Sequence, residues 1–346
     1  MSERKIAPGE STTVSSGNVV IKVEPSAGHR RSPRTLLLLG LLAASIMMNI
    51  LLLTGSLFSV PSSGSVRQQH RAGNAAAADK LAVIRFTGTI MPPFTERWID
   101  QIRDAAIDAS VKGVLLEIDS PGGLVADSHQ IYHELQKLWE NKPVYVAMKR
   151  MAASGGYYIA MGAGPDARIF VEPTTWTGSI GVIIPRYNAA GLASKIGVTS
   201  EPLATGPLKG SLDPFRELRE DEKEVWKEII DDSFARFISV IAENRSSLSE
   251  DDVRHLATGQ VYTAAQALAS GLVDEPGFAE DAIEALATSL NLTDYNVVEY
   301  SSPAGLIDML LGATEPQPDF MKQLLEASVP RALYYCSWNP LVPVHP

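Results

Sequence analysis

The stretch Met151-Ala152-Ala153-Ser154-Gly155-Gly156-Tyr157-Tyr158 places a serine between small residues, where a strand-like run ends and a helix-like run begins. A serine hydroxyl is a weak nucleophile until a base removes its proton. N–H groups at the start of a helix lack intrahelical partners and favour negative charge, so they can donate to an oxyanion. The stretch therefore makes Ser154 a candidate nucleophile with an oxyanion donor beside it.

A glycine turn, Asp119-Ser120-Pro121-Gly122-Gly123, follows the apolar run Gly113 to Ile118. Consecutive glycines let the backbone direct an N–H toward a substrate where a side chain would block the approach. Taken alone, this turn is more often an ordinary strand-to-helix connection. Its position upstream of Ser154, with each motif following a strand, favours a hydrolytic site.

Strand-like and helix-like runs alternate around both motifs, and they place the chain in the α/β class with a mostly parallel sheet. The expected strands lie at Leu81–Phe86, Gly113–Ile118, Pro143–Met148, Arg168–Val171 and Ile180–Ile184. The expected helices lie at Trp98–Ser110, Val125–Trp139, Gly155–Met161, Glu220–Asn244 and Ala264–Ser270.

No histidine has a convincing place in a catalytic triad. His129 and His133 share one helix face, because four residues separate them. The sequence His-Gln-Ile-Tyr-His lacks the glutamate of the zinc motifs, so it predicts solvent-facing or capping histidines and no metal site.

Lys209 is the better candidate base, because it follows Gly206-Pro207 in a loop. A lysine acts as a base only when it is neutral, which requires burial to lower its pKa from about 10.4. A single loop lysine is nevertheless a solvated charge far more often than a base. Lys149 is closer to Ser154 in sequence, but it ends a strand beside Arg150 and is expected to stay exposed and charged.

These motifs resemble those of the signal peptide peptidase A family of serine proteases, in the order that family shows. The resemblance covers about residues 80–300, and the eight residues from Met151 to Tyr158 are its most specific part. The other matching segments are Asp119–Gly123, Thr177–Gly181, Lys209–Phe215, Gly259–Tyr262 and Gly271–Asp274. Pro207 and Leu208 depart from the more polar residues usual before the lysine.

The resemblance implies a role for each candidate residue. Ser154 would be the nucleophile, Lys209 the general base and Ser179 the residue that orients the lysine. The N–H groups of Gly123 and Gly155 would form the oxyanion hole. No cofactor and no metal would be needed.

The resemblance also implies a ClpP/crotonase-like fold of repeated ββα or βαβ units. The chain contains one copy of this set of motifs, so it is similar to the short members of the family and not to the duplicated ones. Members of the family form membrane-tethered homo-oligomeric rings, octamers among the short members, and the dyad is completed between neighbouring units.

Residues 35–60 hold no charged side chain, and roughly 20 apolar residues suffice to cross a bilayer. A cleaved signal peptide usually has an apolar region of about 7–15 residues, and a buried soluble helix rarely stays uncharged on every face. A single transmembrane helix is therefore favoured. Arg30, Arg31 and Arg34 precede it, so the positive-inside rule predicts an inner-membrane protein with its catalytic domain on the extracytoplasmic side.

The remaining organisation follows from composition. Residues 1–34 are expected to form a disordered cytoplasmic tail, 61–79 a linker, 80–300 the peptidase domain and 301–346 a C-terminal extension. The chain has 346 residues, and its formal net charge of -10 argues against a nucleic-acid partner. Cys336 is the one cysteine, which rules out an intramolecular disulfide.

The leading hypothesis is a membrane-anchored serine endopeptidase that hydrolyses signal-peptide remnants and other unfolded hydrophobic peptides. One alternative is a crotonase-like acyl-CoA enzyme, since that fold also builds an oxyanion hole from glycines at strand ends. The other is an inactive ring scaffold, against which the presence of both Ser154 and Lys209 argues.

Overall fold

The computed structural model describes residues 12–15, 18–21, 42, 45–47, 66–302 and 333–335. The chain forms two compact units, residues 1–63 and 64–346. In the first unit, strands β1 (Thr12–Ser15) and β2 (Asn18–Ile21) pair in antiparallel fashion. This pair lies in the segment predicted to be disordered, and its β-branched threonines and valines favour extended backbone.

The predicted transmembrane helix at residues 35–60 lies outside the described residues, apart from positions 42 and 45–47, which are helical. Among the helices that the structure does describe, none combines the length and the apolar character that a membrane crossing requires. The predicted helix therefore remains a prediction.

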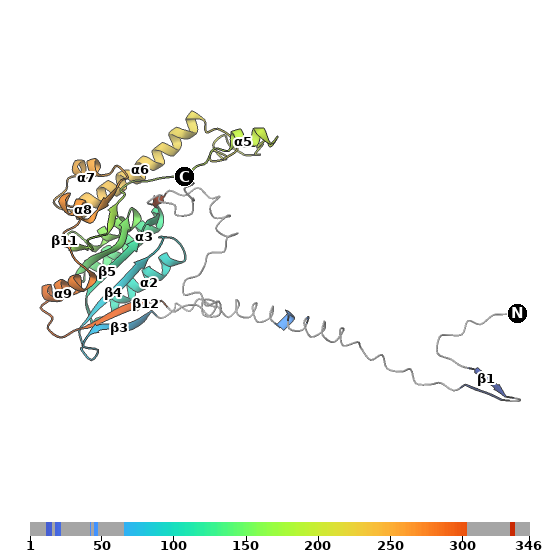
Figure 1. The fold of residues 1–346 in the computed structure, drawn as a ribbon, viewed down its shortest axis with the longest axis horizontal. Helices are drawn as coiled ribbons and strands as arrows, with labels where there is room; N and C mark the ends of the chain where they lie inside the picture. The colour runs from blue at the N-terminus through green and yellow to red at the C-terminus, as the bar shows by residue number, and fades with distance from the viewer. Residues whose placement is uncertain are drawn as a thin grey trace. The chain divides into compact units, whose positions relative to one another are not determined.

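The second unit is built on a mixed sheet that runs β10-β9-β7-β5-β4-β12-β3, with β8 and β11 continuing it beside β7 (Figure 1). Its central strands β4, β5, β7 and β12 are parallel, whereas β3 and β10 are antiparallel edge strands. The strands are β3 Arg67–Gly73, β4 Lys80–Thr87, β5 Val111–Ser120, β6 Gly122–Leu124, β7 Val144–Ala153, β8 Ile169–Val171, β9 Trp176–Gly178, β10 Val261–Thr263, β11 Glu275–Pro276, β12 Asn296–Ser301 and β13 Leu333–Tyr335.

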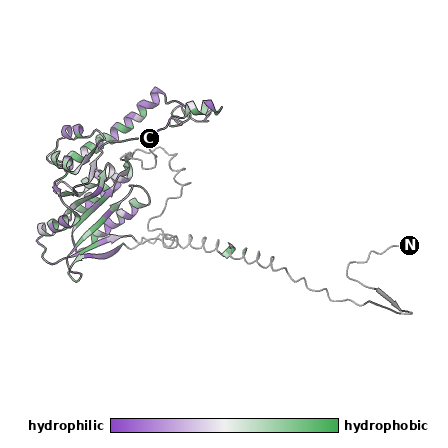
Figure 2. Cartoon of the chain, viewed as in Figure 1, coloured by the Kyte–Doolittle hydropathy of each residue, from purple (hydrophilic) through white to green (hydrophobic). Residues whose placement is uncertain are grey.

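Helices cover both faces of this sheet, because its central strands are apolar on both sides (Figure 2). Ile84 and Leu116 pack into the larger core beneath α2, α3 and α4, while their neighbours Val83 and Leu115 pack against α9. The helices are α2 Phe94–Ile107, α3 Val125–Trp139, α4 Gly155–Ala160, the short 3₁₀ helix η1 Met161–Ala163, α5 Ala190–Lys195, α6 Glu220–Asn244, α7 Glu250–Leu256, α8 Ala264–Ala269 and α9 Ala279–Ser289.

The α/β class is confirmed, and the helices predicted at 125–139 and 220–244 have the predicted bounds. The strand predicted at Ile180–Ile184 is wrong. The strand at this place is β9, which ends at Gly178, and the chain then leaves the sheet in an arm, residues 183–219, that leads to α6. Ile180 is buried in the core, but Ile183 is exposed in the arm, so the apolar run does not continue as a buried strand.

The sheet also begins earlier than predicted, because β3 lies within residues 61–79, which were expected to be a linker. Its residues are almost all exposed and polar, so the strand carries no hydrophobic alternation. It pairs with β12 at the sheet edge, where charged side chains are typical because they discourage further pairing.

Candidate active site

Ser154 lies at the junction of β7 and α4 and is completely buried. Its backbone adopts φ 54° and ψ −115°, a conformation that costs a non-glycine residue about 1–3 kcal/mol. The Ser154 N–H donates to the carbonyl of Gly178 at 2.7 Å, and the N–H of Tyr158 donates to the Ser154 carbonyl at 2.8 Å. Such a strained turn between a strand and a helix is typical of a nucleophilic serine held in a fixed position.

The two tyrosines of the motif anchor the helix that follows Ser154. The buried Tyr157 hydroxyl donates to the Leu272 carbonyl at 2.7 Å. The Tyr158 hydroxyl forms a hydrogen bond of 2.7 Å with Nδ1 of His129. These bonds join α4 to the segment after α8 and to α3, so the small-residue motif sits in a rigid frame.

Gly123 and Gly155 lie next to each other, which is the arrangement that a shared oxyanion hole requires. A Cβ atom on Gly155 would lie 3.0 Å from the Gly123 nitrogen and 2.7 Å from the Ser128 hydroxyl. A Cβ atom on Gly123 would lie 2.0 Å from the Ile90 carbonyl oxygen. Both positions therefore need glycine, because any side chain would push these backbones apart.

Ser179 also lies close to Ser154, because a backbone hydrogen bond joins Ser154 to the residue before Ser179. Gly178, whose carbonyl binds the Ser154 N–H, directly precedes it. Ser179 is nearly buried, has a left-handed φ of 51° and donates its N–H to the Gln260 carbonyl at 2.7 Å. The structure thus brings together Ser154, Ser179, Gly123 and Gly155.

Lys209 is not part of this group within the described chain. It is exposed and lies in the arm, which contains α5 and lies at the end of α6 that is remote from the sheet (Figure 1). The Ser154 hydroxyl is buried and has no hydrogen-bond partner among the residues that the structure describes. Lys149, the nearer lysine, forms ion pairs with Glu117 at 3.0 Å and with Glu172 at 3.8 Å.

The strand that carries Gly123 is paired on both edges. On one edge, the Ile90 N–H donates to the Gly122 carbonyl and the Leu124 N–H donates to the Ile90 carbonyl. On the other edge, β13 runs antiparallel, with Tyr334 opposite Gly123. Because backbone groups alternate between the edges of a strand, the N–H and carbonyl of Gly123 point to the edge that β13 occupies. This edge of β6 is therefore occupied by an extended segment of the same chain.

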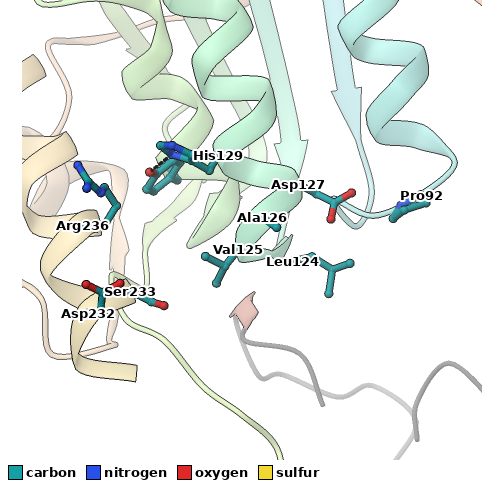
Figure 3. Close-up of a pocket in the computed structure, with 10 residues that line it drawn as sticks. Pro92, Leu124, Val125, Ala126, Asp127, His129, Asp232, Ser233 and Arg236 are labelled. Atoms are coloured by element: carbon teal, nitrogen blue, oxygen red, sulfur yellow. Dashed lines mark hydrogen bonds between the residues drawn. The ribbon is translucent and has the colours of Figure 1, made fainter. Parts of the chain in front are cut away.

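A pocket of about 600 Å³ opens between the start of α3 and helix α6, next to Tyr158 of α4 (Figure 3). Partial desolvation in the pocket, and then the charges of Arg236 and His133, lower the pKa of His129 below its usual value. The pocket is lined by Pro92, Leu124, Val125, Ala126, Asp127, His129, Tyr158, Asp232, Ser233 and Arg236.

Sequence reasoning missed the wall of this pocket that α6 supplies. Asp232, Ser233 and Arg236 lie on a helix that was predicted, but its polar face carried no motif. Sequence reasoning also missed the pairing of β13 with β6, since these strands are separated by about 200 residues and no local pattern links them. His129 was interpreted as a solvent-facing or capping histidine; its side chain is exposed, but it also bonds to Tyr158 and lines the pocket.

Comparison with known proteins gives two family matches. The model of peptidase family S49 matches residues 136–293, and the Clp protease model matches residues 68–203. A putative signal peptide peptidase SppA of Enterococcus faecium is 41% identical over 60% of this chain and 59% of its own length. The putative protease slr0021 of Synechocystis is 37% identical over 67% of this chain and 83% of its own length.

Among solved structures, a mutant of the membrane-bound stomatin-specific protease 1510-N aligns with a TM-score of 0.46 and 18% identity, covering 66% of this chain and all of the other. The relatives found by sequence have a much higher identity to this chain than that structure has. The chain belongs to the signal peptide peptidase A family, peptidase family S49. It spans somewhat less than two thirds of the Enterococcus relative that it matches.

Proposed function

We propose that this protein is a membrane-anchored serine endopeptidase that uses Ser154 and Lys209 as a catalytic dyad. The observation that carries the proposal is the strained, buried Ser154, set beside the adjacent backbones of Gly123 and Gly155. Membership of a peptidase family supports the same reaction class.

In this mechanism the neutral amine of Lys209 accepts the Ser154 hydroxyl proton while the oxygen attacks the substrate carbonyl. The N–H groups of Gly123 and Gly155 donate to the oxyanion, and one such donor is worth about 10²–10³ in rate. The protonated amine then gives its proton to the leaving nitrogen as the peptide bond breaks. Water, activated by the same amine, hydrolyses the acyl-enzyme and restores Ser154. Ser179 accepts or donates a hydrogen bond that orients the lysine.

The substrates in this proposal are extended, unfolded peptides, among them signal-peptide remnants. Pairing of β13 along β6 supports an extended backbone at this edge, since strand addition gives affinity without regard to sequence. The neighbouring pocket has mainly apolar residues at the start of α3, which favours hydrophobic side chains. A membrane anchor would place the site where such peptides are left after processing.

The dyad in this proposal forms between neighbouring protomers of a homo-oligomeric ring, which we expect to be an octamer. Ser154 lacks a partner among the described residues, whereas Lys209 is exposed on the arm. Large exposed apolar side chains on a monomer mark an interaction surface, and a second copy of the chain would cover them. The large exposed apolar side chains of the arm are Ile183, Tyr187, Leu192, Ile196, Val198, Leu203, Leu208 and Phe215.

A serine-directed fluorophosphonate probe tests the nucleophile directly. We expect the purified full-length protein to gain one covalent label, located on Ser154 by peptide mass spectrometry. The Ser154→Ala variant should gain none, and Ser289→Ala, which changes an exposed serine at the end of α9, should still be labelled. An unlabelled native protein with intact assembly would favour the inactive scaffold, and labelling at another serine would contradict the assignment.

The membrane orientation has its own test. If residues 35–60 span the inner membrane with the N-terminus inside, protease added to spheroplasts should digest the body after residue 66 but leave an N-terminal epitope tag intact. Tag digestion with a protected body would invert the proposed topology. A soluble mature form that begins near residue 61 would replace the anchor with a cleaved signal peptide.

A further inference from the structure

The loop that carries Lys209 is a succession of tight turns. The Lys209 N–H donates to the Gly206 carbonyl, the Ser211 N–H to the Leu208 carbonyl and the Asp213 N–H to the Gly210 carbonyl, each at 3.2 Å. Such turns leave the remaining backbone carbonyls free for other donors. Turns alone are marginal in water, so the conformation of an exposed loop depends on what holds it from outside.

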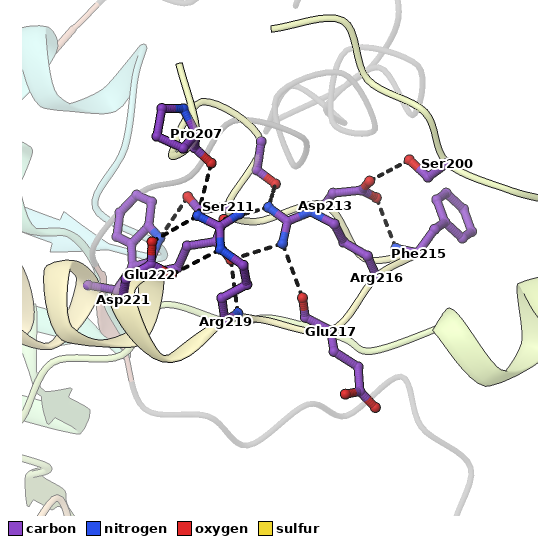
Figure 4. A network of polar contacts seen from close by, with 12 residues as sticks. Ser200, Pro207, Ser211, Asp213, Phe215, Arg216, Glu217, Arg219, Asp221 and Glu222 are labelled. Carbon is purple, nitrogen blue, oxygen red and sulfur yellow. Dashed lines mark hydrogen bonds and ion pairs between the residues drawn. The ribbon is translucent and has the colours of Figure 1, made fainter.

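Two arginine side chains hold this loop on both sides of Lys209 (Figure 4). Arg216 Nη2 donates to the Gly210 carbonyl at 2.5 Å, one residue after the lysine. Arg219 Nη2 donates to the Pro207 carbonyl at 3.1 Å, two residues before it. The planar guanidinium group supplies several donors in a fixed geometry, which suits it to holding a backbone carbonyl and a carboxylate together.

Glu222 connects the two arginines. Its carboxylate accepts from both terminal nitrogens of Arg216, at 2.6 and 2.9 Å, and lies 3.2 Å from Nη1 of Arg219. It also accepts the backbone N–H of Arg219 at 2.9 Å, and its side chain is fully covered. Glu222 lies in the first turn of the 25-residue helix α6, where a negative charge is favourable. Helix α6 is therefore a rigid support for the loop.

A third connection comes from the next turn of the same helix. Trp226 Nε1 donates to the Ser211 hydroxyl at 2.9 Å, two residues after Lys209. Arg219 is further held by Asp221, at 2.9 and 3.0 Å. These contacts come from residues with no part in the proposed chemistry, and all of them end on the loop or on the arginines that hold it.

We propose that Arg216, Arg219 and Glu222 form a clamp that positions the Lys209 loop for catalysis. The inference rests on the proposed function, because it assigns positioning residues to the proposed base. A base must lie within about 2.6–3.2 Å of the proton it removes, and an error of about 1 Å can cost about 10²-fold in rate. An exposed lysine on an unsupported loop would seldom meet that requirement in a neighbouring protomer.

The clamp stays charged over the pH range of catalysis. Hydrogen bonds from Arg216, opposed by burial, lower the pKa of Glu222 to about 2. A carboxyl group with a lowered pKa contributes its stabilisation above its unfolded value and loses it only as the pH falls toward 2. A change of rate near neutral pH or above it therefore does not come from titration of Glu222.

The test is Glu222→Gln in the full-length protein, which keeps the shape of the side chain and removes its charge. We expect kcat, normalised to probe-reactive sites, to fall by about 10- to 100-fold while KM changes by less than about twofold. The acid limb of the pH–rate profile should move to higher pH, because a loosely held amine is better solvated and keeps its proton longer. Arg216→Met should give the same pattern by releasing the Gly210 carbonyl.

Asp231→Asn is the matched control, since it breaks an exposed ion pair with Lys227 on the same helix without touching the loop. It should leave kcat and the pH profile unchanged. A Glu222→Gln enzyme with native kcat would overturn the clamp. The clamp would also be wrong if the lost activity came entirely from fewer probe-reactive sites and the pH–rate profile did not move. Lys209→Ala, assayed in parallel, distinguishes failure of the clamp from failure of the dyad. If Lys209→Ala stays active, the proposed dyad of Ser154 and Lys209 is wrong, and the clamp proposal falls with it.

Discussion

Replacement of Lys209 by arginine is expected to lower kcat by about 10²- to 10⁴-fold, the usual contribution of a general base. Arginine keeps a positive charge of similar reach, but it cannot release its proton near neutral pH, so it cannot accept one from Ser154. Lys209→Ala should be equally inactive. Turnover of a fluorogenic hydrophobic peptide by the purified assembly measures both effects.

The pH dependence of the native protein provides a second measurement of the same step. Because only the deprotonated amine acts as a base, the rate should rise as the pH increases and then level off. Lys195→Arg, at the end of α5 on the same exposed arm, is the matched control and should remain active. A fully active Lys209→Arg enzyme, or a profile with the midpoint of a histidine, would require a different base.

The elements around Ser154 could be predicted because their signals are local. The periodicity of α3 and α6 was sufficient to give their bounds, and the change from strand to helix at Ser154 placed the nucleophile at a turn. Apolar runs that are buried on both faces identified β5 and β7 in the same way. These features depend on neighbouring residues, which a sequence displays directly.

The features that escaped prediction depend on partners distant in sequence. β3 is a polar edge strand that is recognisable only once β12 is known to lie beside it. The apolar run Ile180–Ile184 begins with the buried Ile180 and continues into the arm, where Ile183 is exposed, so its pattern imitates that of a strand. The clamp of Arg216 and Glu222 lies in a charged stretch that composition alone describes as a solvated surface.

The candidate site shows the same difference between residues that one chain brings together and a residue that needs a distant partner. Ser154, Ser179, Gly123 and Gly155 meet within one chain, because the ends of adjacent strands bring them together. Lys209 lies on the exposed arm, and no hydrogen bond joins it to Ser154 in the described part of the chain. A head-to-tail interface between identical subunits repeats around a ring, so an arm from each protomer can serve the serine of the next.

Mixed assemblies of two inactive variants should therefore regain activity. We expect Ser154→Ala and Lys209→Ala proteins each to be inactive alone, and their co-assembled mixture to recover measurable hydrolysis. In a random equal mixture, about a quarter of the interfaces would join an intact serine to an intact lysine, as the geometry of a closed ring with head-to-tail contacts requires. Differently tagged chains, purified in tandem, ensure that only mixed assemblies are assayed.

The control for this experiment is a chain that carries both substitutions, mixed with Ser154→Ala. It supplies no interface with both residues intact, so it should remain inactive at any ratio. Recovery in the first mixture and none in the second would assign the two halves of the dyad to different protomers. If tandem-purified mixed rings of the single variants stay inactive, Ser154 and Lys209 act within one chain, and the arm must then fold back onto its own sheet during catalysis.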